Sequence, residues 1–244
     1  MADVIQSLWV GNRLSVMERL CIASFLHHGH PFHLYTYQPL DGVPAGTALM
    51  DGNEILPESS IFMYRGYATY AGFSNFFRYK LLLERGGWWV DMDMICLRPF
   101  DFDQPYVFSS ELEPDGPHVN VGAMKVPPES AVMTMAWSEC SRLDPKELTW
   151  GQTGPILAAA AVEAHSLQQH VKPPHVFCPV HLSDWTKVLD RNVKWEFSED
   201  TYAIHLWNEL WRRENQPKNA TYADGCLYET LKRRYLDMHR GDNR

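Results

Sequence analysis

The chain has 244 residues, of which 45% are hydrophobic and 21% are charged, and its formal net charge is −8. This length and composition predict one large globular domain over residues 1–244. The acidic balance argues against a general nucleic-acid binder, which needs a basic surface.

The first part of the chain is typical of a parallel sheet. Residues 4–10 form an apolar strand pattern, residues 14–28 have helical spacing, and residues 32–37 form a second strand pattern. A strand, a helix and a strand within forty residues predict a right-handed βαβ unit. Residues 38–60 are rich in glycine and proline, so we expect a surface connection with one short strand at 54–56.

The stretch from residue 71 to residue 101 has the clearest pattern. A helix is predicted over residues 73–84, ended by the Gly86-Gly87 pair, and apolar strands follow at 88–91 and 94–100. The remaining expected elements are strands at 106–110, 119–126, 175–179 and 202–206, and helices at 129–142, 152–165 and 222–238.

Two aspartates, Asp91 and Asp93, follow the strand at 88–91. In an extended strand, residues two apart point to the same side, so the two carboxylates are expected to converge. Because neighbouring carboxylates resist joint ionisation, a divalent cation between them would relieve the repulsion. Hard oxygen ligands favour Mg²⁺ or Mn²⁺. The alternative is a pair of solvated turn aspartates.

The preceding helix carries two polar residues on one face. Asn75 and Arg78 are three positions apart, so they share that face and can direct donors into a site. The alternative for Arg78 is an ion pair with a strand-end aspartate such as Asp91.

Residues 73–93, FSNFFRYKLLLERGGWWVDMD, resemble the long signature of the glycosyltransferases with a DXD-containing sugar-binding region. This family includes bacterial capsule and lipopolysaccharide transferases, yeast initiating mannosyltransferases and α1,4-galactosyltransferases. Weaker similarity appears in GQTGP at 151–155 and AIHLWNELW at 203–211. The resemblance implies an α/β fold of the GT-A type. This is a Rossmann-like, mostly parallel central sheet flanked by helices, with C-terminal helices and a closing loop.

The resemblance also implies which half of the chain binds which substrate, and it implies a set of site residues. Residues 1–110 would form the nucleotide-sugar-binding half, and residues 111–244 the acceptor-binding half and the lid. Asp93 would bind Mn²⁺ or Mg²⁺ directly, and Asp91 would contact the ribose or metal-bound water. Arg78 would contact donor phosphate or sugar hydroxyls.

Two further positions of the signature bear on the donor. Trp89 occupies the aromatic position before the aspartates. Asn75 stands where the family usually has Asp, a departure that leaves the donor sugar open because an amide carries no charge.

Outside the long signature, the resemblance assigns further donor contacts. Leu8, Trp9 and Val10 end the first strand, where such folds hold the base, in agreement with ligand binding at the carboxyl ends of parallel strands. Asn120 would face the donor sugar or the acceptor; its alternative role is in a turn or bulge. Gln152 would lie under the anomeric carbon; its alternative role is as a helix N-cap.

The C-terminal segment 203–211 completes the implied site. His205 would be a metal ligand, as a neutral imidazole can bind Mn²⁺, although an isolated histidine is more often structural. Trp207, Asn208 and Trp211 would form a loop that closes over the donor and excludes water. The alternative is that the two tryptophans pack in the core.

The function that the resemblance implies is a retaining, metal-dependent hexosyl transfer. The donor would be a nucleotide-sugar, UDP-linked by preference or GDP-mannose. The acceptor would be a glycan or glycolipid, in bacterial surface polysaccharide synthesis. Two other classes remain open. One is a haloacid-dehalogenase-type phosphohydrolase, in which the first aspartate is a nucleophile; the other is a non-catalytic, metal-dependent sugar-binding module.

The expected location is cytoplasmic. The five cysteines are widely spaced without a CxxC pair, which favours a reducing compartment. No secretory leader or bilayer-spanning stretch is recognised. The basic residues Lys232, Arg233 and Arg234 allow a peripheral contact with an anionic membrane at the inner membrane face, and a solvated helix face is the alternative.

Overall fold

The computed structural model describes residues 3–236. Its centre is a six-stranded sheet with the order β3-β2-β1-β4-β7-β6. Strands β3, β2, β1 and β4 pair in parallel, and β7 pairs antiparallel to both of its neighbours, so β7 alone opposes the direction of this sheet. The strands are β1 (Ile5–Leu8), β2 (Phe32–Thr36), β3 (Thr47–Asp51), β4 (Gly87–Val90), β6 (Val107–Glu113) and β7 (Gly116–Val126).

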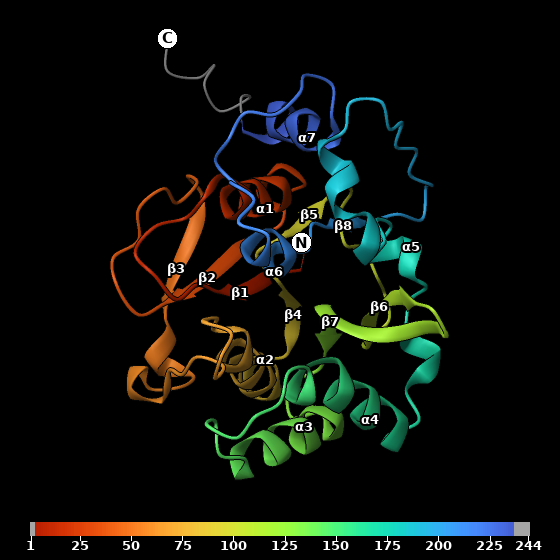
Figure 1. The fold of residues 1–244 in the computed structure, drawn as a ribbon. Helices are drawn as coiled ribbons and strands as arrows, with labels where there is room; N and C mark the ends of the chain where they lie inside the picture. The colour runs from red at the N-terminus through yellow and green to blue at the C-terminus, as the bar shows by residue number, and fades with distance from the viewer. Residues whose placement is uncertain (1–2, 237–244) are drawn as a thin grey trace.

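Helices cover both faces of this sheet (Figure 1). One face carries α1 (Val16–His27) and α7 (Leu227–Tyr235), and the other carries α2 (Ala71–Arg85), α3 (Ala131–Arg142) and α4 (Leu157–Ala164). The two core clusters divide between the faces, since Trp88 packs in the first and its neighbour Trp89 packs in the second. This follows from the period of two along a strand.

The remaining elements are short. A second, two-stranded sheet joins β5 (Met94–Cys96) to β8 (Ala203–His205), and α5 (Pro174–Phe177) and α6 (Asn208–Arg213) flank β8 in sequence. Single turns of helix lie at η1 (Gly52–Glu54), η2 (Glu58–Ser60), η3 (Gln152–Ile156, a π turn) and η4 (Gln168–His170), with a longer 3₁₀ segment at η5 (Leu182–Leu189).

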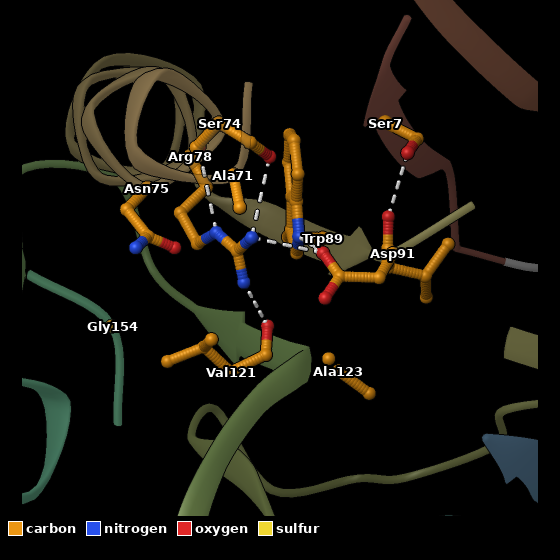
Figure 2. Close-up of polar contacts among 12 residues, drawn as sticks. Ser7, Ala71, Ser74, Asn75, Arg78, Trp89, Asp91, Val121, Ala123 and Gly154 are labelled. Atoms are coloured by element: carbon orange, nitrogen blue, oxygen red, sulfur yellow. Dashed lines mark hydrogen bonds and ion pairs between the residues drawn. The ribbon is translucent and has the colours of Figure 1, made fainter. Parts of the chain in front are cut away.

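The junction between α2 and β4 needs its glycines. Gly86 and Gly87 have φ values of 61° and 81°, which side chains rarely adopt. A Cβ at Gly86 would also clash with the backbone around Pro128. This tight turn lets α2 fold back along β4, which places Asn75 and Arg78 beside the end of that strand (Figure 2).

Most predicted elements are present, and the fold expected from the sequence is confirmed. The short strand expected at 54–56 is wrong: Glu54 ends the η1 turn, and the strand that pairs with β2 is β3, at 47–51. The strand expected at 175–179 is also wrong, because Pro174 begins the helical turn α5, and proline suits a first helical turn.

Two helix predictions also need correction, and one helix was missed. The helix expected at 152–165 opens with the π turn η3, and α6 was not expected. The last helix begins at Leu227 rather than at residue 222, and the predicted part beyond residue 236 lies outside the described residues. Between residues 3 and 236, none of the helices combines the length and the apolar character that crossing a bilayer demands.

Candidate metal and donor site

Three potential metal ligands meet where β4 ends. Asp91, Asp93 and His205 each offer one ligand atom, and these atoms lie within 4.8 Å of one another. His205 reaches the aspartates because β8 pairs antiparallel with β5, which sets it opposite Met94. The backbone N–H of Leu206 also donates to the carbonyl of Asp93 at 3.0 Å. The fold thereby joins two distant sequence segments.

The two aspartates converge by a route that differs from the expected one. β4 ends at Val90, and the N–H of Met94 donates to the carbonyl of Asp91 at 3.1 Å, which closes a turn. Alternation along an extended strand is therefore the wrong explanation. The turn itself brings the carboxylates of Asp91 and Asp93 together.

Asp93 is buried, with 7% of its surface exposed. Its Oδ2 accepts a hydrogen bond from the backbone N–H of Asn208 at 2.7 Å and lies 3.2 Å from Nε2 of His205. Burial alone would raise the pKa of Asp93, but the imidazole and the Asn208 amide hold this pKa below its usual value. Burial alone would lower the pKa of His205, and the Asp93 carboxylate more than offsets it, so this pKa is raised. Without a cation, the two groups form an ion pair.

The imidazole of His205 is held on its other side as well. Its Nδ1 lies 3.8 Å from Sγ of Cys178, and the ring of Trp207 lies 4.0 Å away between centroids. Nε2 is therefore the nitrogen directed at Asp93. Cys178 was not identified from the sequence, because an isolated buried cysteine has no local pattern that links it to a distant histidine.

Arg78 is the main partner of Asp91 (Figure 2). Its Nη2 lies 2.9 Å from Oδ1 of Asp91, and its Nη1 donates to the carbonyl of Val121. The indole N–H of Trp89 donates to the same Oδ1 at 2.9 Å, and the guanidinium lies 4.9 Å from the Trp89 ring centroid. Within residues 3–236, no hydrogen bond reaches Oδ2 of Asp91. The ion-pair alternative for Arg78 is thus present, and its donor contact stays a prediction.

Asn75 is buried near the segment 152–154. Its Nδ2 donates to Oγ1 of Thr153 at 3.4 Å, and a Cβ at Gly154 would lie 3.2 Å from the same nitrogen. Gln152 instead accepts from the N–H of Thr149 at 3.0 Å, within a turn. The structure therefore brings Thr153, the residue after Gln152, next to Asn75. The predicted contact of Gln152 with the donor sugar stays a prediction.

Asn120 is buried on β7, two residues before Gly122. Its Oδ1 accepts from the N–H of Gly122 at 2.6 Å, and its Nδ2 donates to Glu111 at 3.2 Å. A Cβ at Gly122 would lie 2.7 Å from Asn120 Oδ1 and 3.5 Å from the His205 ring, so a side chain there would displace Asn120. The expected alternative role, in a bulge beside this glycine, is present, since the β6–β7 register shifts nearby.

The predicted base-binding residues end β1 at the same edge. Leu8 is buried, whereas Trp9 and Val10 are half-buried. Lys218 lies 5.8 Å from the Trp9 ring centroid and donates to Oδ1 of Asn208 at 2.9 Å. It also pairs with the buried Glu18. Lys218 was not identified from the sequence, and it links the predicted base site to the predicted closing loop.

The two tryptophans of the predicted closing loop are buried. Trp207 has a positive φ of 58° and donates its indole N–H to the carbonyl of Val180 at 2.9 Å. Trp211 is fully buried against Trp185 and Tyr228. Both rings therefore pack in the core, as the alternative prediction stated. A closing role for this segment stays a prediction.

The ligand set is suited to a particular class of ion. Two carboxylates and one imidazole are suitable ligands for Mn²⁺ or Mg²⁺. A cavity of about 450 Å³ lies elsewhere, near Gln6, His33 and Lys125 where β1 and β4 begin, and contains none of the predicted site residues. The position of the candidate metal site therefore rests on the convergence of Asp91, Asp93 and His205, and not on a cavity.

Metal binding should be coupled to the release of a proton. Because the pKa of His205 is raised, its stabilising charge is fully present below its unfolded pKa and is lost as pH rises through the folded pKa. A metal needs the neutral imidazole, so Mn²⁺ affinity should weaken by up to about tenfold for each pH unit below that pKa. Titration calorimetry between pH 6 and 8, in buffers of different ionisation enthalpy, measures both the affinity and the released proton.

His205→Ala is the matched control for this titration. The variant should bind Mn²⁺ more weakly and release no proton from residue 205. A pH-independent Mn²⁺ affinity in the unsubstituted chain would contradict the coupling between His205 and the metal.

Two segments of the chain match models of known protein families, and each segment contains metal-ligand candidates. Residues 23–111 match a model described as a glycosyltransferase sugar-binding region containing a DXD motif, and residues 147–235 match the α1,4-glycosyltransferase conserved region. The first match contains Asp91 and Asp93, and the second contains His205. The curated protein sequences include no significant match.

Among solved structures, the chain is similar to the PaToxG glycosyltransferase, with 16% identity and a TM-score of 0.50 over 67% of this chain and 70% of that one. This likeness concerns the fold. A structure described as a transferase mutant with cysteine-to-serine substitutions has a TM-score of 0.44 and 10% identity over 68% of this chain and 86% of that one.

Proposed function

Because residues 23–111 match the glycosyltransferase sugar-binding region with a DXD motif and residues 147–235 match an α1,4-glycosyltransferase region, we propose that the chain transfers a hexose from a nucleotide-sugar to a hydroxyl group of a glycan or lipid-linked glycan. The observation that carries this proposal is the convergence of Asp91, Asp93 and His205 at the carboxyl edge of the sheet. A UDP-sugar is the favoured donor, and GDP-mannose is the second choice.

A divalent cation has a defined place in this proposal. Asp91, Asp93 and His205 would hold Mn²⁺ or Mg²⁺. When bound, such an ion neutralises negative charge on the departing nucleoside diphosphate. The protein keeps the ligands oriented beforehand: Arg78 and Trp89 hold one oxygen of Asp91, and the Asn208 amide holds Asp93. Orientation by such secondary contacts is usual for metal ligands.

Transfer with retention of the anomeric configuration fits the side chains near the site. The acceptor hydroxyl would attack the anomeric carbon on the face that the diphosphate leaves. A new C–O bond forms, the bond to the diphosphate oxygen breaks, and that oxygen takes the acceptor proton. Asn75 and Asn120 are uncharged, so they would bind sugar hydroxyls, and the departing charge would be left to the cation and Arg78. Gln152 would contact the sugar through Nε2, because its Oε1 accepts from the N–H of Thr149.

The donor nucleotide would lie across the end of β1. Leu8, Trp9 and Val10 would contact the base, and the segment that begins at His205 would cover the diphosphate. Lys218 supports this arrangement because it contacts both Trp9 and Asn208. Its charge is partly offset by Glu18.

A role in bacterial surface polysaccharide synthesis is part of the proposal, as is peripheral contact with the inner membrane face. The basic residues of α7 give this contact little support. Lys232 pairs with Glu229, and Arg233 pairs with Asp224. Two of the three basic charges are thus matched within the chain, which favours the solvated helix face.

A panel of UDP- and GDP-sugars with Mn²⁺ or Mg²⁺ tests the proposed function. Metal-dependent release of the nucleoside diphosphate is the expected result, and the anomeric configuration of the product, read by NMR, tests retention. Inorganic phosphate release from a phosphomonoester would indicate a phosphohydrolase instead. Donor binding without turnover, with every acceptor class supplied, would indicate a sugar-binding module.

A further inference from the structure

We propose that three exposed side chains, Tyr67, Trp150 and Arg213, form a platform that stacks against a pyranose ring of the acceptor. The proposal rests on the function proposed above and assigns the acceptor to the glycans. We call these three residues the aromatic platform. They come from three segments that are far apart in the sequence: the loop before α2, the loop before η3, and the end of α6.

Two glycine turns present the rings of the platform. The N–H of Tyr67 donates to the carbonyl of Tyr64 at 3.2 Å across a turn that contains Gly66, whose φ is 83°. The N–H of Gln152 donates to the carbonyl of Thr149 at 3.2 Å across a turn in which Trp150 precedes Gly151, whose φ is 80°. Because the backbone is fixed on both sides, each ring is held outward at little further cost in conformational entropy.

The three side chains contact one another. The rings of Tyr67 and Trp150 lie 5.0 Å apart between centroids, tilted by 40°. The guanidinium carbon of Arg213 lies 4.5 Å from the centroid of Trp150 and 5.4 Å from that of Tyr67. Tyr64 supports Trp150 from the buried side at 5.3 Å. The three side chains of the platform therefore pack as one cluster and are not isolated surface residues.

The platform remains open to solvent. Tyr67 is 39% exposed, Trp150 is 38% exposed, and the side chain of Arg213 is 37% exposed. Exposure of one ring would be ordinary, but two exposed rings in contact form a contiguous apolar surface, and such surfaces are typical of binding sites. The partially negative face of an aromatic ring attracts the polarised C–H groups on one face of a pyranose.

Arg213 adds polar donors to the same surface. Its Nε donates to Glu209 at 2.8 Å, and within residues 3–236 no hydrogen bond is formed by its two terminal amino groups. Sugar hydroxyls need such planar donors beside the stacking ring. An apolar partner would leave these donors unsatisfied on burial, which disfavours an apolar protein surface as the occupant.

The platform is tied to the donor site on both sides. On one side, Thr153 lies three residues after Trp150 and contacts Asn75. On the other side, Arg213 ends α6, whose first residue, Asn208, contacts Asp93. A helix rises about 1.5 Å per residue, so these six residues set Arg213 about 8 Å along α6 from that contact. This span suits a sugar unit next to the reacting centre.

A groove lined by the same two loops would extend the surface for a longer glycan. It has a volume of about 350 Å³ and lies between the two loops that carry Tyr67 and Trp150. Its lining combines apolar and basic side chains: Phe62, Met63, Arg65, Pro145 and Lys146. The acceptor surface would therefore continue past the platform sugar.

Saturation-transfer NMR with a panel of neutral disaccharides (lactose, cellobiose, maltose and mannobiose) tests the platform in the presence of UDP and Mn²⁺. At least one disaccharide should bind the full chain, and Trp150→Ala and Tyr67→Ala should each weaken that binding at least about tenfold. Trp150→Phe should keep most of it. Leu112→Ala is the control, because Leu112 is a 48% exposed side chain on β6 outside the platform.

A kinetic measurement separates the platform from the donor site. With the disaccharide that binds, Trp150→Ala should raise the acceptor KM at least about tenfold and change the donor KM less than about twofold, with an unfolding midpoint close to that of the unsubstituted chain. The platform proposal would be overturned if none of the disaccharides bound. It would also be overturned if both alanine variants bound the disaccharide as tightly as the unsubstituted chain. Absence of metal-dependent donor turnover, with disaccharide binding intact, would overturn the proposed function instead.

Discussion

Replacing Asp93 by Asn should reduce metal-dependent turnover by about a thousandfold or more. The amide oxygen can still accept the hydrogen bond from the Asn208 backbone, so the local shape is kept. It cannot supply the negative charge that binds a divalent ion, and metal stabilisation of transition-state charge amounts to several kcal/mol. The free energy of unfolding should fall by only about 1 kcal/mol, because His205 can lose its proton when its partner is neutral. Initial rates across Mn²⁺ concentrations and chemical denaturation measure the two effects.

Asp103→Asn is the matched control for this substitution. Asp103 is an exposed aspartate ten residues further along the chain, and its variant should keep both turnover and stability. Unchanged turnover in Asp93→Asn would remove Asp93 from the metal site.

Arg78→Lys should lower turnover by about ten- to a hundredfold even though the positive charge is kept. The planar guanidinium reaches Asp91, the Val121 carbonyl and Ser74 at once, which a single ammonium group cannot do. Asp91 would then lose its fixed orientation. Arg78→Met should cost about 2 kcal/mol of unfolding free energy, less than for a fully buried pair because the Asp91 side chain is 25% exposed. Steady-state kinetics and urea denaturation test the two variants.

Arg85 provides the comparison on the same helix. It forms an exposed ion pair with Glu54, so Arg85→Lys and Arg85→Met should change stability by less than about 0.5 kcal/mol. If Arg78→Lys has the turnover of the unsubstituted chain, the three-partner geometry of Arg78 is not needed for turnover.

The α2–β4 unit could be predicted because its signals are local. Helical spacing, two glycines with positive φ and an apolar strand are consecutive in the chain, and each fixes its own backbone. The same locality explains the failures. β3 has a weak, half-exposed pattern and forms because β2 offers it a partner, and α5 follows from Pro174 rather than from apolar periodicity.

The sequence by itself determined the mixed α/β class, the α2–β4 unit and the pair of aspartates that ends it. Only the tertiary structure decided which groups surround those aspartates. The β5–β8 pairing brings His205 to Asp93, and Cys178 contacts His205 from a segment with no recognisable pattern. In the same way, Thr153 reaches Asn75 and Lys218 reaches Asn208. The physical reason is that backbone preferences act over a few neighbouring residues. Contacts between distant side chains depend on how strands pair and helices pack.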